Sequence, residues 1–237
     1  MTAPFYTARN HLGVELGADA TTAQLRTAGR GFDYAVLPAV AAARIGPLVG
    51  EIGLVVRGPI PATPDPRWGW EPLGPLPAGP SHLPLFLHVF PGDPVDAVVH
   101  ADAVRVTAPD LATAGAMRAR VRAAARAGGL DPGVLPVLAD LDVHITDKGR
   151  PAAPDRLSVT GSAADVARVI EAGVRLRAAD GVTLRPRDPE NDLRRLAAEL
   201  IPLLAGRGLF RPGPPGPLRD RLALGAHPAT VPTVESA

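Results

Sequence analysis

Short apolar runs rich in β-branched residues alternate along this chain with segments of helical period. Almost continuous apolar character is typical of strands that are buried on both faces. Alternation of such strands with helices indicates βα units around a parallel sheet. The pattern predicts seven strands, at His11–Gly17, Phe32–Pro38, Ile52–Arg57, Leu83–Val89, Ala103–Thr107, Leu135–Ile145 and Gly181–Leu184.

The segments between these runs carry the signals of helices. Thr22–Gly29 and Pro109–Arg126 have helical composition, and glycines follow the second of them. Ser162 and Asp165 form a capping-box pattern ahead of apolar residues at helical spacing. A leucine stripe over Leu193–Leu204 predicts a last helix.

Seven strands with intervening helices are close to the eight of a full barrel, which typically needs about 250 residues. The chain has 237 residues, and Pro59–Pro84 is dense in proline and fits no regular element. We therefore predict an α/β fold, a TIM-like (β/α) barrel that is incomplete, with about seven strands and a proline-rich insertion replacing part of the middle. Residues 1–211 should form this single domain, and the proline-rich residues 212–237 an extended C-terminal tail.

Composition narrows the range of partners. With 25 Lys and Arg against 24 Asp and Glu, the chain has no basic field to attract nucleic acid or an anionic membrane, so a small molecule is the expected partner. The absence of cysteine excludes thiolate metal sites and fits a cytoplasmic location. Met1–Asn10 lacks the pattern of a signal peptide, and no run reaches the roughly 20 apolar residues of a membrane span. The six histidines are scattered, so no metal site is predicted.

Three blocks in the second half of the chain resemble a known family. His100–Ile145, beginning HADAVRVTAPDL, Gly161–Pro186, beginning GSAADVARVIEAG, and Arg207–Pro228, beginning RGLFRPGPPGPL, occur in the family's order. They are similar to the luciferase-like flavin-dependent monooxygenases, in particular the branch with nitrilotriacetate and dibenzothiophene-sulfone monooxygenases. Gly31–Ala39 and Ile45–Gly58 are weaker matches to the second and third strands.

The resemblance implies a parallel barrel that dimerises. Complete members bind reduced flavin mononucleotide (FMN), activate oxygen and oxidise an organic substrate. For this shortened chain it implies either a homodimer or a heterodimer with a full-length homologue.

The chain departs from the family where the flavin is held. The strand resembling LPLFLHVF usually continues into Gly-Ser-Ser beside the flavin phosphate, but here Phe90, Pro91, Gly92 and Asp93 follow. Pro91 has no N–H to donate, and Asp93 brings a negative charge to the expected phosphate position. The family's fourth strand, with its Trp-Asn-Val-Val-Thr-Ser run, is not visible, and Arg57 stands where small residues commonly face the ring. Arg57 and Gly92 remain as the candidate cofactor contacts.

Two residues on predicted strands are candidates for catalysis. His88 lies near the carboxyl end of a strand, where barrel enzymes keep their chemistry, and could act as an acid, a base or a ring contact. The alternative is a histidine satisfied by a hydrogen bond inside the barrel, and His144 has a similar standing. Glu15 is a carboxylate in an apolar run, so it should be neutral or paired, with Arg57 as one candidate partner; a structural ion pair is the favoured interpretation.

The only tryptophans, Trp68 and Trp70, lie two residues apart in the proline-rich insertion. They suit a lid over an apolar substrate or an anchor in a partner surface. Alternatively, they cover the open side of the incomplete barrel.

Two functions remain open at this point. The first is a flavin-dependent oxidoreductase or monooxygenase that uses reduced FMN, or a deazaflavin in its place, and oxygen on a small organic substrate. The second is a non-catalytic barrel homologue that binds no FMN, has lost the phosphate site and serves as a binding or dimer-partner protein.

Overall fold

The computed structural model describes residues 10–38, 41, 53–57, 86–146, 155–210, 222 and 224, with only the backbone in 53–57. Its strands form one sheet in which every pairing is parallel. The strands are β1 (His11–Glu15), β2 (Tyr34–Pro38), β3 (Gly53–Arg57), β4 (Phe86–Val89), β5 (Ala103–Val106), β6 (Val137–Ile145), β7 (Ser158–Gly161) and β8 (Gly181–Pro186).

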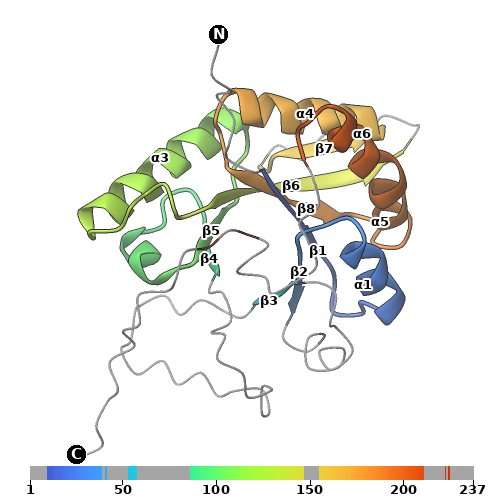
Figure 1. The fold of residues 1–237 in the computed structure, drawn as a ribbon, viewed down its shortest axis with the longest axis horizontal. Helices are drawn as coiled ribbons and strands as arrows, with labels where there is room; N and C mark the ends of the chain where they lie inside the picture. The colour runs from blue at the N-terminus through green and yellow to red at the C-terminus, as the bar shows by residue number, and fades with distance from the viewer. Residues whose placement is uncertain are drawn as a thin grey trace, which may run out of the picture.

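The sheet curls into a half-barrel, which confirms the predicted incomplete TIM-like barrel. Its order is β3-β2-β1-β8-β6-β5-β4, so β3 and β4 are the two end strands (Figure 1). The connection between these end strands, residues 58–85, contains the predicted insertion and lies outside the described residues. Among the described strands, the gap in the sheet therefore lies between the two strands that flank the predicted insertion. The predicted division into residues 1–211 and 212–237 stays a prediction.

Each of the seven predicted strands has a counterpart, and one further strand, β7, was not predicted. It has four residues, two of them hydroxyl-bearing, and it runs directly into Ser162, the N-cap of the next helix. A period-two pattern cannot be recognised over so few residues.

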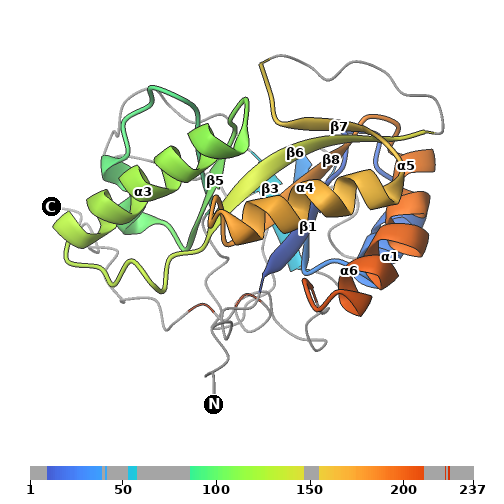
Figure 2. The same cartoon turned by 90° about the horizontal axis from the view of Figure 1, so that it is seen from above.

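In a regular barrel β7 would lie between β6 and β8, but here it pairs with the opposite edge of β6. Asp142 and Val143 of β6 pair with β8 on one edge and with β7 on the other. β5 pairs with the first residues of β6, and Leu157 donates its N–H to the carbonyl of Ala108 just after β5. β7 therefore continues along the edge of β6 that β5 leaves, and β8 packs directly beside β6 (Figure 2).

The helices lie on the convex side of the sheet (Figures 1 and 2). The capping box at Ser162 and Asp165 is confirmed, and a second one joins Thr21 and Gln24. The last helix contains a π-helical turn, Leu196–Leu200, just before Pro202, whose missing N–H interrupts the regular hydrogen-bond ladder. The elements are α1 (Thr22–Gly29), the 3₁₀ helix η2 (Asp96–His100), α3 (Leu111–Ala127), α4 (Ala163–Arg175), α5 (Asn191–Arg195) and α6 (Ile201–Gly206).

Apolar side chains cover the convex face of the sheet, whereas the concave face is apolar only in part. On the convex face, two clusters join the strands to the helices. On the concave face, a small cluster contains Tyr34, Val36, Ala103, Leu138 and Leu222. Further along the same strands towards their carboxyl ends, the concave positions become polar, and the candidate site is there.

Candidate functional site

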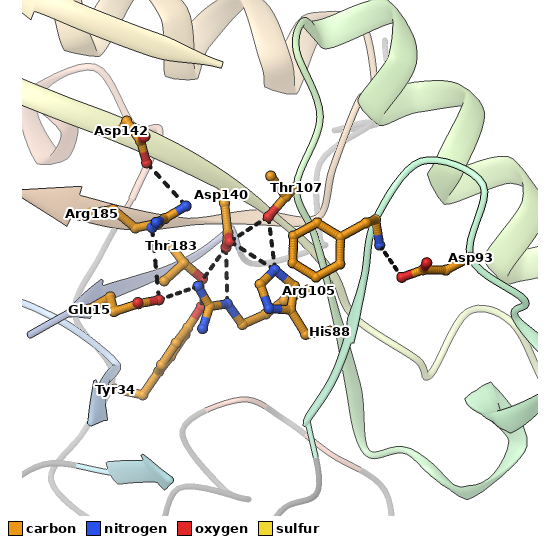
Figure 3. Close-up of polar contacts among 11 residues, drawn as sticks. Glu15, Tyr34, His88, Asp93, Arg105, Thr107, Asp140, Asp142, Thr183 and Arg185 are labelled. Atoms are coloured by element: carbon orange, nitrogen blue, oxygen red, sulfur yellow. Dashed lines mark hydrogen bonds and ion pairs between the residues drawn. The ribbon is translucent and has the colours of Figure 1, made fainter. Parts of the chain in front are cut away.

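Polar residues at alternate positions on neighbouring strands face the concave side. On β6 the buried apolar residue Leu138 is followed, two and four positions on, by Asp140 and Asp142. On β5, Ala103 is followed in the same way by Arg105 and Thr107. Successive side chains of a strand point to opposite faces, so these residues share one face and gather towards the carboxyl ends (Figure 3). Carboxyl ends of parallel strands are where barrel enzymes hold their active sites.

Arg105 is the centre of this cluster. Its Nε and Nη2 donate to Oδ1 of Asp140 at 2.9 and 2.8 Å, and Nη2 also donates to Oε2 of Glu15 at 2.6 Å. Arg105 and Asp140 are 3% exposed and Glu15 12%, so little water competes for these bonds. Three strands, β1, β5 and β6, are therefore tied together by one guanidinium group.

The ion pair keeps both central groups charged. Burial alone would raise the pKa of Asp140, but the charge of Arg105 and the contact with His88 hold it below its ordinary value. Burial alone would lower the pKa of Arg105, and the carboxylates of Asp140 and Glu15 reverse this and raise it. Asp140 is thus an acceptor of hydrogen bonds throughout the physiological range of pH.

His88 contacts the second oxygen of the same carboxylate. Its Nε2 lies 3.1 Å from Oδ2 of Asp140 and 2.8 Å from Oγ1 of Thr107, which itself donates to that Oδ2 at 2.9 Å. The His88 ring is 18% exposed and lies against the ring of Phe90, with centroids 4.5 Å apart. His88 therefore contacts a buried carboxylate and is itself partly exposed. We call the concave side of the half-barrel at the carboxyl ends of its strands the mouth.

A second, more exposed layer lies outside Arg105. Arg185 of β8 approaches Oδ1 of Asp142 at 3.3 Å and Oε2 of Glu15 at 4.0 Å. Partial burial raises the pKa of Asp142, and Arg185 counteracts this only in part. Partial burial and a raised pKa are common properties of carboxyl groups that exchange protons.

Below the charged cluster, Tyr34 closes the concave face. Its hydroxyl bonds Oγ1 of Thr183 at 2.6 Å, and its ring meets Phe86 edge-on with centroids 5.4 Å apart. A Cβ on Gly13 would lie 2.1 Å from this ring, so only glycine permits the ring to cross β1 here. Burial raises the pKa of Tyr34 far above its ordinary value, so the phenol stays protonated.

The structure brings the two predicted catalytic residues together through residues that the sequence did not single out. Glu15 and His88 are joined through Arg105 and Asp140. The signal for Arg105 and Asp140 was a charged residue at alternate positions inside an apolar strand. His144, the other histidine considered, bonds Asp192 of α5 at 3.3 Å and takes no part in the cluster.

Of the predicted cofactor contacts, Gly92 lies in the tight turn that follows β4, with a φ of 92°. Arg57 ends β3, but its side chain is outside the described residues, as are Trp68 and Trp70. The roles given to these four residues stay predictions.

The turn after β4 does not fit a phosphate group. The N–H of Phe90 already donates to Oδ2 of Asp93 at 2.8 Å, and the N–H of Asp93 donates to the carbonyl of Phe90 at 3.1 Å. Pro91 has no N–H, which leaves only that of Gly92 among the four. The carboxylate of Asp93 therefore already accepts a hydrogen bond from an N–H that could otherwise bind an anion.

An apolar crevice lies on the other side of the sheet. It separates α4 from the convex face of β1, β6 and β8, and its walls include Leu12, Leu141, Ile170, Gly173 and Val182. It is almost free of polar atoms and does not reach the charged cluster, so we assign it no chemistry. Within the described ranges, no group of three or more His, Cys, Asp or Glu side chains could hold a metal ion. No described helix is long and apolar enough to cross a bilayer.

Fold and site together define an open parallel (β/α) barrel with a charged cluster at the carboxyl ends of its strands. A riboflavin lyase bound to modified FMN and riboflavin shares this fold, with a TM-score of 0.67 and 13% identity over 90% of this chain and 95% of that one. The EDTA monooxygenase of Chelativorans sp. BNC1 gives 0.63 and 14% over 92% and 99%. The coenzyme F420-dependent tetrahydromethanopterin reductase of Methanopyrus kandleri gives 0.61 and 13% over 83% and 99%.

At 13–14% identity these neighbours show the fold alone, and that fold is the parallel barrel that the resemblance stated from the sequence implies, so the resemblance is confirmed at the level of the fold. The chain spans only 42% and 44% of two other matched structures, a long-chain alkane monooxygenase and DmoA from Hyphomicrobium sulfonivorans. No protein-family model and no curated protein sequence matches the chain.

Proposed function

We propose that this chain is a luciferase-like oxidoreductase or monooxygenase that acts on a small organic substrate at the concave mouth of the half-barrel. The observation that carries this proposal is the contact of His88 with the buried, ionised Asp140 at the carboxyl ends of the strands. A histidine that is held by a buried carboxylate and is partly accessible is suited to general acid–base catalysis.

The side chains at this site can move protons but not electrons. An oxidoreductase here therefore requires a redox cofactor. The structural neighbours, whose names include FMN and coenzyme F420, support a flavin or deazaflavin. Because the turn after β4 does not fit a phosphate, the phosphate of such a cofactor has to be held elsewhere. Arg57 and the N–H of Gly92 are the proposed contacts with the cofactor.

A second candidate function is a non-catalytic barrel that acts as a binding or dimer-partner protein. The hydrogen bond from Phe90 to Asp93 favours it, because the turn satisfies itself where a cofactor phosphate is expected. In this case the chain would pair with a full-length homologue, whereas the enzyme would form a homodimer. Under the first hypothesis Trp68 and Trp70 serve as a lid over the substrate, and under the second as a partner anchor. A cytoplasmic location suits both.

Titration of the purified protein with oxidised and reduced FMN, with riboflavin and with coenzyme F420 separates the two candidates. Calorimetry and quenching of Trp68 and Trp70 fluorescence report binding. Saturable micromolar binding that His88→Gln weakens supports the oxidoreductase. If neither flavin nor coenzyme F420 binds at near-millimolar concentration, the oxidoreductase proposal is wrong and the non-catalytic partner remains.

A further inference from the structure

We infer that the Thr107–Asp140 pair holds neutral His88 with its proton on Nε2, so that Nδ1 is the proton-accepting atom presented to a ligand. This inference deepens the proposed function, on which its catalytic meaning rests. Thr107 and Asp140 act as positioning residues, and His88 is the residue that meets the ligand.

The directions of three hydrogen bonds fix the proton. Asp140 is ionised, so its Oδ2 can only accept. The hydroxyl of Thr107 lies 2.9 Å from that Oδ2 and donates to it, which leaves a lone pair on Oγ1 facing Nε2 of His88 at 2.8 Å. An N–H on Nε2 then has two acceptors, Oγ1 and the carboxylate oxygen at 3.1 Å.

The opposite tautomer meets repulsion at the same atoms. Without a proton, Nε2 would direct its lone pair at the charged Oδ2 of Asp140 at 3.1 Å. If the hydroxyl of Thr107 turned to donate to Nε2, its own lone pairs would face that oxygen at 2.9 Å. Buried acceptors set against one another are costly, so the network selects one tautomer.

The other ring nitrogen is open to a ligand. Nδ1 forms no hydrogen bond with any residue that the structure describes, and it is not among the buried polar atoms without a partner, so it is accessible. Phe90, 41% exposed, packs beside the ring and limits its rotation. Among the described residues, the charged groups around His88 are Asp140 on β6 and Arg105 on β5, with Glu15 on β1 beyond the guanidinium.

This geometry defines the chemistry of the ligand atom that meets His88. It has to be an O–H or N–H donor, or an acid that gives up its proton to Nδ1. In that transfer the ligand bond to hydrogen breaks, its electron pair stays on the ligand, and His88 becomes an imidazolium. The positive charge then faces Asp140, which stays ionised.

Two-bond ¹⁵N–¹H correlation spectra of the ¹⁵N-labelled protein, recorded at alkaline pH, test the inference without any flavin. The expected spectrum shows His88 with a protonated Nε2 and an unprotonated Nδ1, in at least a tenfold excess over the other form. His144 is an internal control of opposite sign, because its Nδ1 faces the carboxylate of Asp192 at 3.3 Å. A protonated Nδ1 on His88, or a fast exchanging mixture, would overturn the inference.

Two substitutions at His88 separate the two nitrogens. The amide of His88→Gln reaches the position of Nε2 and can still donate to Thr107 and Asp140, whereas that of His88→Asn reaches only the position of Nδ1. His88→Gln should keep the melting temperature of the parent and lose affinity for FMN at least tenfold, while His88→Asn should melt at a lower temperature. The opposite order of melting temperatures would contradict the inference. Absence of flavin binding with the expected tautomer in place would contradict only the proposed function.

Discussion

Arg105 binds only one of the two carboxylate oxygens of Asp140. Both guanidinium donors of Arg105 bind Oδ1, at 2.9 and 2.8 Å, and this leaves Oδ2 for Thr107 and His88. Oδ1 therefore pairs with the cation, and Oδ2 contacts Thr107 and His88. The cation keeps the carboxylate ionised, and the ionised carboxylate orients the ring.

Replacing this cation should destabilise the fold strongly. Arg105→Met leaves the buried Asp140 without its counter-ion, and removal of one partner of a buried ion pair typically costs about 3–5 kcal/mol. Equilibrium unfolding in urea measures the change in the free energy of unfolding. Arg185→Met is the matched control, because Arg185 is 23% exposed and its loss should cost less than about 1 kcal/mol. Equal losses in the two variants would show that Arg105 is not the central cation.

Gly13 should tolerate no side chain while Tyr34 is present. A Cβ would lie 2.1 Å from the phenol ring, so Gly13→Ala forces the ring to move and should cost about 2–3 kcal/mol. In a Tyr34→Ala background the clash is gone, and the same substitution should cost under about 1 kcal/mol. Thermal or urea denaturation of the four proteins gives the coupling energy. Additive losses would mean that the ring is not the obstacle.

A helix glycine should be replaceable with a gain in stability. Gly115 lies inside α3, and the nearest atom to an added Cβ is the Cα of Ala178 at 3.7 Å, an ordinary contact. Gly115→Ala should raise the free energy of unfolding by about 0.5–1 kcal/mol, because alanine loses less backbone entropy. Gly92→Ala is the contrasting control: space is free there, but the φ of 92° should cost about 1 kcal/mol. Calorimetric melting of both variants should therefore give shifts of opposite sign.

Asp180 should make stability depend on acidity. Burial alone would raise its pKa, but hydrogen bonds from Arg118 and from the N–H of Val137 hold it below the ordinary value. A lowered pKa in the folded state stabilises the fold above the unfolded value of about 3.9, and this stabilisation is lost as the pH falls through the folded pKa. Asp180→Asn should lose about 2 kcal/mol in the free energy of unfolding at pH 7, and the difference from the parent should shrink as the pH falls below about 3.9. If the difference in the free energy of unfolding between parent and variant stayed constant as the pH falls, the ionised carboxylate would not be its cause.

Removal of the Asp93 carboxylate should increase the affinity of the site for FMN relative to riboflavin. Asp93→Ala frees the N–H of Phe90 and removes a negative charge, so FMN should gain about tenfold in affinity relative to riboflavin, or about 1.4 kcal/mol. Parallel titrations of parent and variant give this ratio. An unchanged ratio would place any flavin phosphate away from this turn.

Much of the fold could be predicted because it depends on signals of adequate length. The apolar runs at β1, β2 and β6 were recognisable, and the capping box at Ser162 located the start of α4. β7 could not be found, because its pairing with β6 depends on where β5 ends, and that is decided by packing rather than by local sequence.

The candidate site was predicted in part for a similar reason. Glu15 and His88 stand out as single polar residues in apolar runs, but their connection runs through Arg105 and Asp140, which lie 35 positions apart in the chain. Composition does not reveal which strands are neighbours, so the sequence suggested Arg57 as a partner of Glu15 and did not point to Arg105. Only the register of β5 against β6 brings the guanidinium to the carboxylate.

The position of β8 in the sheet has a consequence for the kinetics of folding. Pairings close in sequence hold β3, β2 and β1 together, and likewise β6, β5 and β4, but within the described sheet the two groups are joined only through β8. Contacts between distant parts of a chain slow folding, because the entropy of loop closure is lost before the contact forms. During synthesis, the strands that begin at His11 must therefore wait for Gly181–Pro186 to emerge from the ribosome before the barrel wall can assemble.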